Sequence, residues 1–247
     1  MYDLKCGDCL QLMKDISNKS VDMILCDLPY NVTQNKKDIS LPFNLLWEQY
    51  ERIIKDNGII CLFAQGIFYV DLVNSNRKMF KYDLIWDKEL ITGFLNAKKM
   101  PLRSHEQIAI FYKKTPQYFP QMITGSPLHS KGIKYIEKIP KNNNYGKFNV
   151  VNDDRCGEIK KYPKSIWKFK KPHPSISKHP TEKSILLLEE LIKTYTKNGD
   201  LVLDNCMGSG TTGIACLKTN RNFIGIEIDR DYFEISKNRI ENLILGK

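Results

Sequence analysis

The sequence has no apolar run that approaches the roughly 18 residues a helix needs to cross a bilayer. Charged residues interrupt its first segment, MYDLKCGDCLQLMKD, so we expect no secretory signal peptide. The seven cysteines lack the spacing of a disulfide framework, and the four histidines lack the spacing of metal ligands. These absences disfavour membrane, disulfide-stapled and metal-dependent proteins. They predict a cytoplasmic protein without a metal site.

The excess of positive charge is confined to one stretch of the chain. Residues 113–183 hold 16 Lys and Arg against 5 Asp and Glu, which leaves 22 basic and 23 acidic residues elsewhere. Aromatic residues such as Tyr118, Tyr135 and Trp167 are interleaved with the basic ones. This combination favours binding to a nucleic acid, although a solvated lysine-rich surface has the same composition.

Strand and helix patterns alternate on both sides of that stretch. Apolar runs at 2–8, 21–27, 59–64, 82–88, 106–113, 200–206 and 222–229 predict strands. Helical spacing appears at 43–58, where Gly58 is the expected stop, and at 181–199, 211–220 and 231–244. The pattern predicts an α/β protein with a doubly wound, mostly parallel sheet in a single domain, 1–247. The proline-punctuated range 115–178 is expected to be a region inserted into it.

A glycine-rich turn joins a strand to a helix in LVLDNCMGSGTTG. Gly208, Gly210 and Gly213 match the G-x-G-x-x-G pattern, and Glu227 ends the next strand, 17 residues beyond Gly210. Glycines allow a ligand to approach the backbone closely, and an acid on the second strand can accept two ribose hydroxyls. The pattern predicts a nucleoside-type cofactor. It fits NAD as well, so an NAD-dependent oxidoreductase remains an alternative.

A second turn, ILCDLPYN, ends another strand with residues that an ordinary turn would not favour. Asp27 and the carbonyl of Leu28 are hydrogen-bond acceptors, Pro29 stiffens the loop, and Tyr30 offers a flat face. Two acceptors and a stacking face suit a planar ring with an exocyclic amine. A base in a duplex would reach this loop only after flipping out of the stack. If the two strands are neighbours, the two turns meet at one edge of the sheet.

Four segments resemble those of the S-adenosylmethionine-dependent DNA amino-methyltransferases. DLPY is similar to their Asp/Asn-Pro-Pro-Tyr motif, LDNCMGSGTTG to their cofactor motif, HPTEK to their His-Pro-Thr-x-Lys-Pro signature, and KCGDC to the Gly-Asp segment before the catalytic strand. The motif order resembles the β class, a circularly permuted, Rossmann-like methyltransferase fold. The chain departs from the family pattern at four positions: Leu28, Ser184, Asn205 and Cys206. The change at Asn205 and Cys206 could remove an aromatic wall beside the cofactor.

The resemblance implies methyl transfer from S-adenosylmethionine to the 6-amino group of a flipped adenine in double-stranded DNA. It implies that Asp27, Leu28, Pro29 and Tyr30 are the catalytic residues. The implied cofactor-binding residues are Asp8, Thr181, Lys183, Asp204, Gly208, Ser209, Gly210, Thr211, Thr212 and Glu227. The range 115–178 would be the target-recognition region. A homodimer is an open expectation, and a restriction endonuclease partner cannot be read from the sequence.

Cytosine-N4 remains an alternative target, because the preference for adenine is associated with an Asp where the cytosine enzymes usually carry Ser. RNA and protein-glutamine acceptors also remain open, since a similar loop can bind other planar amines and amides. A decayed fold that only binds DNA is disfavoured, because Asp27, Pro29, Tyr30 and GSGTT are intact. Trp167 could either contact DNA or pack in a core.

Overall fold

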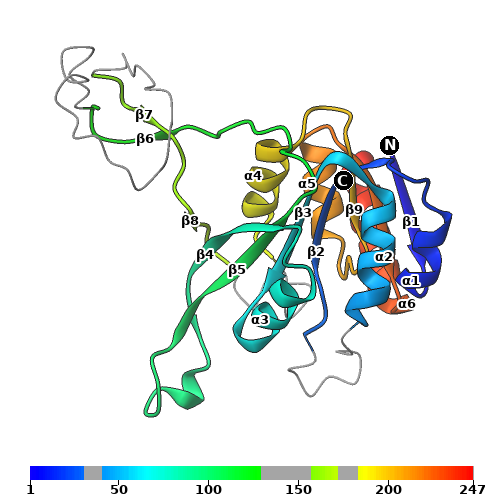
Figure 1. Ribbon diagram of the computed structural model, residues 1–247, viewed down its shortest axis with the longest axis horizontal. Coiled ribbons are helices and arrows are strands. Elements are labelled where there is room, and N and C mark those ends of the chain that lie inside the picture. Colours follow the sequence, from blue (N-terminus) through cyan, green and yellow to red (C-terminus); the bar gives the residue numbers. More distant parts are fainter. Residues whose placement is uncertain (31–40, 129–156, 172–182, 247) are drawn as a thin grey trace. The chain divides into compact units, whose positions relative to one another are not determined.

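The computed structural model describes residues 1–30, 41–128, 157–171 and 183–246 (Figure 1). The chain forms two compact units, one of Met1–Phe119 with Ser165–Lys247 and one of Pro120–Lys164. The smaller unit contains a two-stranded antiparallel sheet of β6 (Ile123–Thr124) and β7 (Lys160–Lys161). The range 115–178 includes this unit, and its role in target recognition stays a prediction.

The larger unit is built on an eight-stranded sheet with the order β1-β10-β9-β2-β3-β5-β4-β8 (Figure 1). The strands are β1 (Tyr2–Cys6), β2 (Val21–Asp27), β3 (Ile54–Ala64), β4 (Phe80–Thr92), β5 (Arg103–Phe111), β8 (Ile166–Lys168), β9 (Leu201–Asp204) and β10 (Asn222–Glu227). Only the β3–β5 and β4–β5 pairings among these described strands are antiparallel. The predicted α/β fold with a mostly parallel sheet is therefore confirmed.

Helices cover both faces of this sheet. They are α1 (Cys9–Leu12), α2 (Phe43–Ile53), α3 (Gly66–Ser75), α4 (Ile185–Tyr195), α5 (Thr211–Lys218) and α6 (Arg230–Ile244), with the short 3₁₀ helices η1 (Met13–Asp15) and η2 (Phe94–Asn96). Along β2, Ile24 and Cys26 pack in the core with α1–α3, whereas Met23 and Leu25 pack in the core with α4–α6. Side chains alternate between the two faces of a strand, so a strand covered on both faces is apolar throughout. The sheet is doubly wound.

The predicted helix stop at Gly58 is wrong. Helix α2 ends at Ile53, and the chain turns directly into β3, where Gly58 lies inside the strand. The pairing of β2 with β3 shifts here, from Val21 opposite Ile54 to Met23 opposite Ile59. A Cβ on Gly58 would lie 2.8 Å from the Ile54 side chain, so the glycine permits close backbone approach at a bulge rather than a helix end.

Trp167 belongs to the core. It lies in β8, pairs with Trp86 of β4 and is 8% exposed among the residues that pack with α4–α6. Burial answers the question that the sequence left open about this tryptophan. In the part of the chain that the structure describes, no helix is both long and apolar enough to span a membrane.

Candidate active site

Acidic residues lie at the carboxyl ends of four adjacent parallel strands. Asp27 ends β2, Asp204 ends β9, Glu227 ends β10, and Asp8 follows the end of β1. The order β1-β10-β9-β2 makes each of these strands a neighbour of the next. Because parallel strands end at the same edge, the sheet gathers the four acids at one edge. The predicted meeting of the Asp27 and Asp204 turns follows from the direct pairing of β2 with β9.

The Asp27 carboxylate is bonded on both of its oxygens. Oδ1 accepts a hydrogen bond of 2.6 Å from the hydroxyl of Tyr30, and Oδ2 is 2.6 Å from the ammonium nitrogen of Lys183. The Tyr30 ring also packs against Phe68 of α3, with 4.7 Å between ring centroids. The side chain of Leu28 is buried. The loop therefore holds a carboxylate beside an aromatic ring.

Behind Asp27 lies a chain of buried charges that the sequence analysis did not identify. Lys183 is 3.1 Å from Glu106 of β5, and the other oxygen of Glu106 is 3.3 Å from Lys88 of β4. Burial opposes the charge on Lys183, but Asp27 and Glu106 outweigh it and raise the pKa of the lysine. Burial likewise opposes the charge on Glu106, and the two lysines outweigh it and lower its pKa. Both shifts favour the charged forms of Lys183 and Glu106.

Asp204 lies in a different environment. Its carboxylate accepts hydrogen bonds from the hydroxyl of Thr212, at 2.6 Å, and from the backbone N–H of Cys206, at 3.1 Å. Burial is the main cause that raises the pKa of Asp204 to about 6, and the hydrogen bonds from Thr212 and Cys206 oppose it. This carboxylate is thus a buried acceptor whose negative charge is only weakly stabilised. A cation bound beside it would stabilise the ionised form.

The glycine-rich turn lies close to α6. Gly208 and Gly210 have positive φ angles of 51° and 79°, which L side chains rarely adopt. A Cβ on Gly210 would lie 2.8 Å from the Cβ of Ser236 in α6. From the same helix, Arg239 donates to the carbonyl and hydroxyl of Ser209 at 2.8 and 2.9 Å, and to the Thr211 hydroxyl at 3.4 Å. Helix α6 therefore sets the shape of this turn.

Two further acids hold nearby backbone in place: Glu227 bonds to the glycine-rich turn, and Asp8 bonds to the first residues of α1. The two oxygens of Glu227 accept from the backbone N–H groups of Gly208 and Asp229, each at 2.8 Å. Asp8 caps α1 by accepting from the N–H groups of Leu10 and Gln11, at 2.7 and 3.2 Å. Each carboxylate oxygen has two lone pairs, so both acids retain acceptor capacity for ligand hydroxyls or amines.

Asn205 and Cys206 occupy the positions where the family motif has Pro and Phe. The Asn205 side chain is buried, and its oxygen accepts a 2.5 Å hydrogen bond from the hydroxyl of Tyr50 in α2. Its amide nitrogen is 3.6 Å from the sulfur of Cys9 and 3.5 Å from the sulfur of Cys206. The substituted pair is thus integrated into the polar packing beneath the turn and provides no aromatic wall.

The structure brings together the predicted residues of the DLPY loop, the glycine-rich turn, Glu227, Asp8 and Lys183, although their roles stay predictions. Thr181 lies outside the described residues. The sequence analysis missed Lys88, Glu106 and Arg239. A signal for Glu106 was present in RSHEQIAIF, because this acid shares the face of Ile108 and Ile110, both of which are buried.

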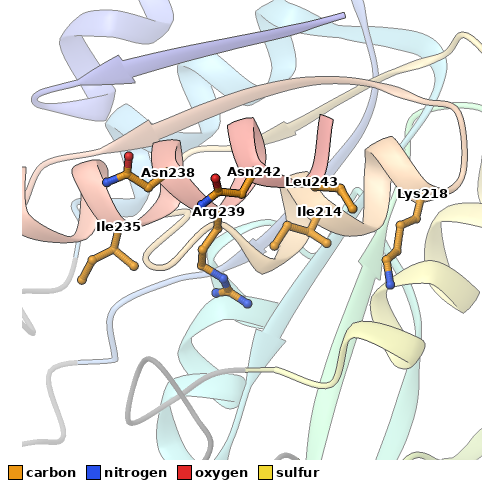
Figure 2. Close-up of a pocket in the computed structure, with 7 residues that line it drawn as sticks. All are labelled: Ile214, Lys218, Ile235, Asn238, Arg239, Asn242 and Leu243. Atoms are coloured by element: carbon orange, nitrogen blue, oxygen red, sulfur yellow. The ribbon is translucent and has the colours of Figure 1, made fainter. Parts of the chain in front are cut away.

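A separate pocket of about 760 Å³ lies between α5 and α6 (Figure 2). Its lining residues are Ile214, Lys218, Ile235, Asn238, Arg239, Asn242 and Leu243. None of them is a predicted site residue. Arg239 connects this pocket with the glycine-rich turn through its bonds to Ser209. The acids at the strand ends, and not this pocket, define the candidate active site.

The fold and this arrangement of acids are those expected of an α/β enzyme with a nucleotide-like cofactor, and comparison with known proteins identifies the family. The model of the DNA methylase family (N6_N4_Mtase) matches residues 21–238. The chain therefore belongs to this family. The match disfavours the NAD-dependent oxidoreductase alternative, because the matched residues include the glycine-rich turn and Glu227.

Individual relatives match over most of their length. The chain is 30% identical to the type II methyltransferase M1.MboII of Moraxella bovis, over 91% of each chain. It is 28% identical to the DNA adenine methyltransferase YhdJ of Escherichia coli (strain K12), over 95% of this chain and 81% of the relative. The crystal structure of an M1.HpyAVI–SAM complex superposes with a TM-score of 0.64 at 26% identity, covering 97% of this chain and all of the other.

Proposed function

We propose that this protein transfers a methyl group from S-adenosylmethionine to the 6-amino group of an adenine in double-stranded DNA. The observation that carries the proposal is the adjacency of β2 and β9, which puts the Asp27 loop beside the Asp204 turn. An acceptor for an amine and a cradle for a cofactor then share one edge of the sheet. Family membership supports the reaction class, and the relative YhdJ, named as an adenine methyltransferase, supports the choice of base.

The chemistry of the residues fits S-adenosylmethionine. Gly208 and Gly210 leave two positions of the turn without a side chain where the methionine end would approach. Buried Asp204 would accept from its ammonium group, and Glu227 would accept from its ribose hydroxyls. Asp8 would accept from its adenine amine. When bound, the cofactor supplies an electrophilic methyl group on a positively charged sulfur, and the acids at this edge favour a cation.

The loop residues of the chain prepare the target amine. The lone pair of an exocyclic amine is delocalised into the base, which makes the nitrogen a poor nucleophile. Asp27 and the Leu28 carbonyl would each accept one N–H of that amine and so draw the nitrogen toward a tetrahedral geometry. Tyr30 would stack on the base once its hydroxyl leaves Asp27. Pro29 limits the motion of the carbonyl before it.

Transfer of tritium from labelled S-adenosylmethionine to unmethylated duplex DNA, followed by nucleoside analysis, tests this proposal. We expect label in 6-methyladenine for the wild type, and a loss of about 100- to 1,000-fold in Asp27→Ala because the carboxylate acceptor is removed. Asp71→Asn, an exposed acid of α3, is the matched control and should retain activity.

The other outcomes separate the alternatives. Label in 4-methylcytosine would contradict the adenine assignment and retain the reaction. Binding of S-adenosylmethionine without transfer to DNA of diverse sequence would contradict the DNA substrate, and RNA and protein acceptors would then be assayed with the same label. Activity retained in Asp27→Ala would contradict the role of the loop.

A further inference from the structure

Glu106 is a buried acid on an apolar face of the sheet. Its side chain is 8% exposed, and it pairs across β4 and β5 with fully buried Trp86. Ile108 and Ile110, which follow on the same face of β5, pack in the core with α4–α6. Removing a carboxylate from water is costly unless it is compensated by nearby charge. A site on this face that only required packing would be served by an apolar residue.

The contacts of Glu106 lead toward Asp27. One oxygen is 3.3 Å from Lys88 and the other is 3.1 Å from Lys183, whose nitrogen is 2.6 Å from Asp27. The oxygen that faces Lys183 is buried and, among the described residues, makes no hydrogen bond of good geometry, so its contact with the lysine is mainly electrostatic. The Lys183 nitrogen also lies 5.1 Å from the ring centroid of Phe63. Glu106 thus attracts Lys183 from the side opposite Asp27.

We propose that Glu106 is a positioning residue for methyl transfer, which acts by holding the Lys183 ammonium group at Oδ2 of Asp27. This inference rests on the proposed function, because it assigns Glu106 to the geometry of the amine acceptor. With Lys183 held between two carboxylates, Asp27 keeps its ion pair, its rotamer and a free lone pair for the amine. Lys88 contacts the other oxygen of Glu106, at 3.3 Å.

Kinetics of Glu106→Gln test the inference, since this change removes the charge and keeps the shape. We expect kcat to fall about 100-fold through misplacement of the acceptor, with the KM for S-adenosylmethionine within about twofold of wild type. Asp56→Asn is the matched control. This acid also contacts two lysines, Lys19 at 2.9 Å and Lys114 at 3.5 Å, but in the amino-terminal half of β3, and it should leave kcat unchanged.

The double variant Glu106→Gln/Lys88→Met separates positioning from simple charge balance. It restores the neutrality of the buried cluster but does not restore the contact with Lys183. We expect kcat to stay low while the melting temperature recovers. Recovery of kcat to the wild-type value would overturn the inference, because Glu106 would then serve only to neutralise Lys88. This comparison also holds if Glu106→Gln alone does not fold.

The pH dependence of kcat gives an independent measurement. Without Glu106, Lys183 loses one of its two stabilising carboxylates, so the alkaline limb of the profile should move to lower pH. The other titratable groups that face this pair are Asp27, Tyr30, Lys88 and Lys171. An unchanged kcat and profile in Glu106→Gln would overturn the inference. Absence of transfer by the wild type would instead overturn the proposed function.

Discussion

The DLPY loop and the glycine-rich turn end neighbouring strands, yet they stabilise their acids by opposite means. Asp27 is paired with the charge of Lys183, whereas Asp204 accepts neutral hydrogen bonds from Thr212 and from the backbone. The side chain of Asp27 is 26% exposed, whereas Asp204 is buried, with 4% of its surface exposed. One acid has a counterion within the chain before any ligand arrives. The other has a raised pKa and gains most from a cation.

This difference matches the two proposed roles, in which Asp27 accepts from the target amine and Asp204 accepts from the ammonium group of the cofactor. An acceptor for a neutral amine needs a permanent charge and a fixed orientation, and a lysine supplies both. An acceptor for a cationic ligand needs no resident counterion, because a lysine there would repel the ligand. Three perturbations test this contrast, beginning with the one expected to have the largest effect.

Lys183→Met should have the largest effect on stability. It leaves Asp27 and Glu106 without their shared cation, and breaking a buried ion pair costs about 3–5 kcal/mol in the free energy of unfolding. The control is Lys193→Met. Lys193 is 42% exposed and pairs with Glu189 at 3.4 Å, so its loss should cost less than about 1 kcal/mol. Denaturant unfolding measures both. Equal losses would show that the DLPY loop does not depend on its lysine.

Asp204→Asn should change the pH dependence of stability. The pKa of Asp204 is about 6 in the folded chain against 3.8 as the ordinary value, so the folded state binds the proton more tightly. This acid therefore stabilises the fold most below about pH 4, and its contribution falls by about 3 kcal/mol as pH rises to 6. The free energy of unfolding is measured for wild type and Asp204→Asn between pH 4 and 7. It should fall more steeply with rising pH in the wild type than in the variant. Parallel curves would contradict a raised pKa.

Gly210→Ala should destabilise the glycine-rich turn by about 1–3 kcal/mol. Its φ is 79°, and the new Cβ would lie 2.8 Å from the Cβ of Ser236. Gly199→Ala is the control, because Gly199 has a similar φ of 85° but open space around the added Cβ. The difference in melting temperature between the two variants isolates the contact with α6. Equal melting temperatures would mean that the turn can move away from α6.

The parts of the fold that follow from local pattern could be predicted from the sequence. The apolar runs of β2 and β9 and the glycine-rich turn are short, contiguous signals, and the strand-end position of Asp27 and Asp204 followed from them. The end of α2 could not be predicted well, because Gly58 is equally a helix stop and a bulge residue. The choice depends on the pairing of β3 with β2, which is not local information.

The buried charges behind Asp27 could not be predicted for the same reason. Lys88 lies in β4, Glu106 in β5 and Lys183 before α4, and only the assembled sheet brings them into contact. Lys88 and Glu106 look like ordinary surface charges in a sequence with 38 basic and 28 acidic residues, and Lys183 was expected to bind the cofactor. The available signal was that Glu106 and Lys88 each lie on an apolar face of a strand. This signal indicates a buried ion pair only when the counterion is known.

The strand order also has a consequence for synthesis of the chain. The late strands β9 and β10 lie between the early strands β1 and β2, and β9 begins 174 residues after β2 ends. At about 5–20 residues per second, the ribosome needs roughly 10–35 s to make that interval. During this time β1 lacks its neighbour β10 and β2 pairs only with β3, so the edge that gathers the four acids does not exist. The strand-end site is therefore incomplete in a nascent chain until β9 and β10 have been made.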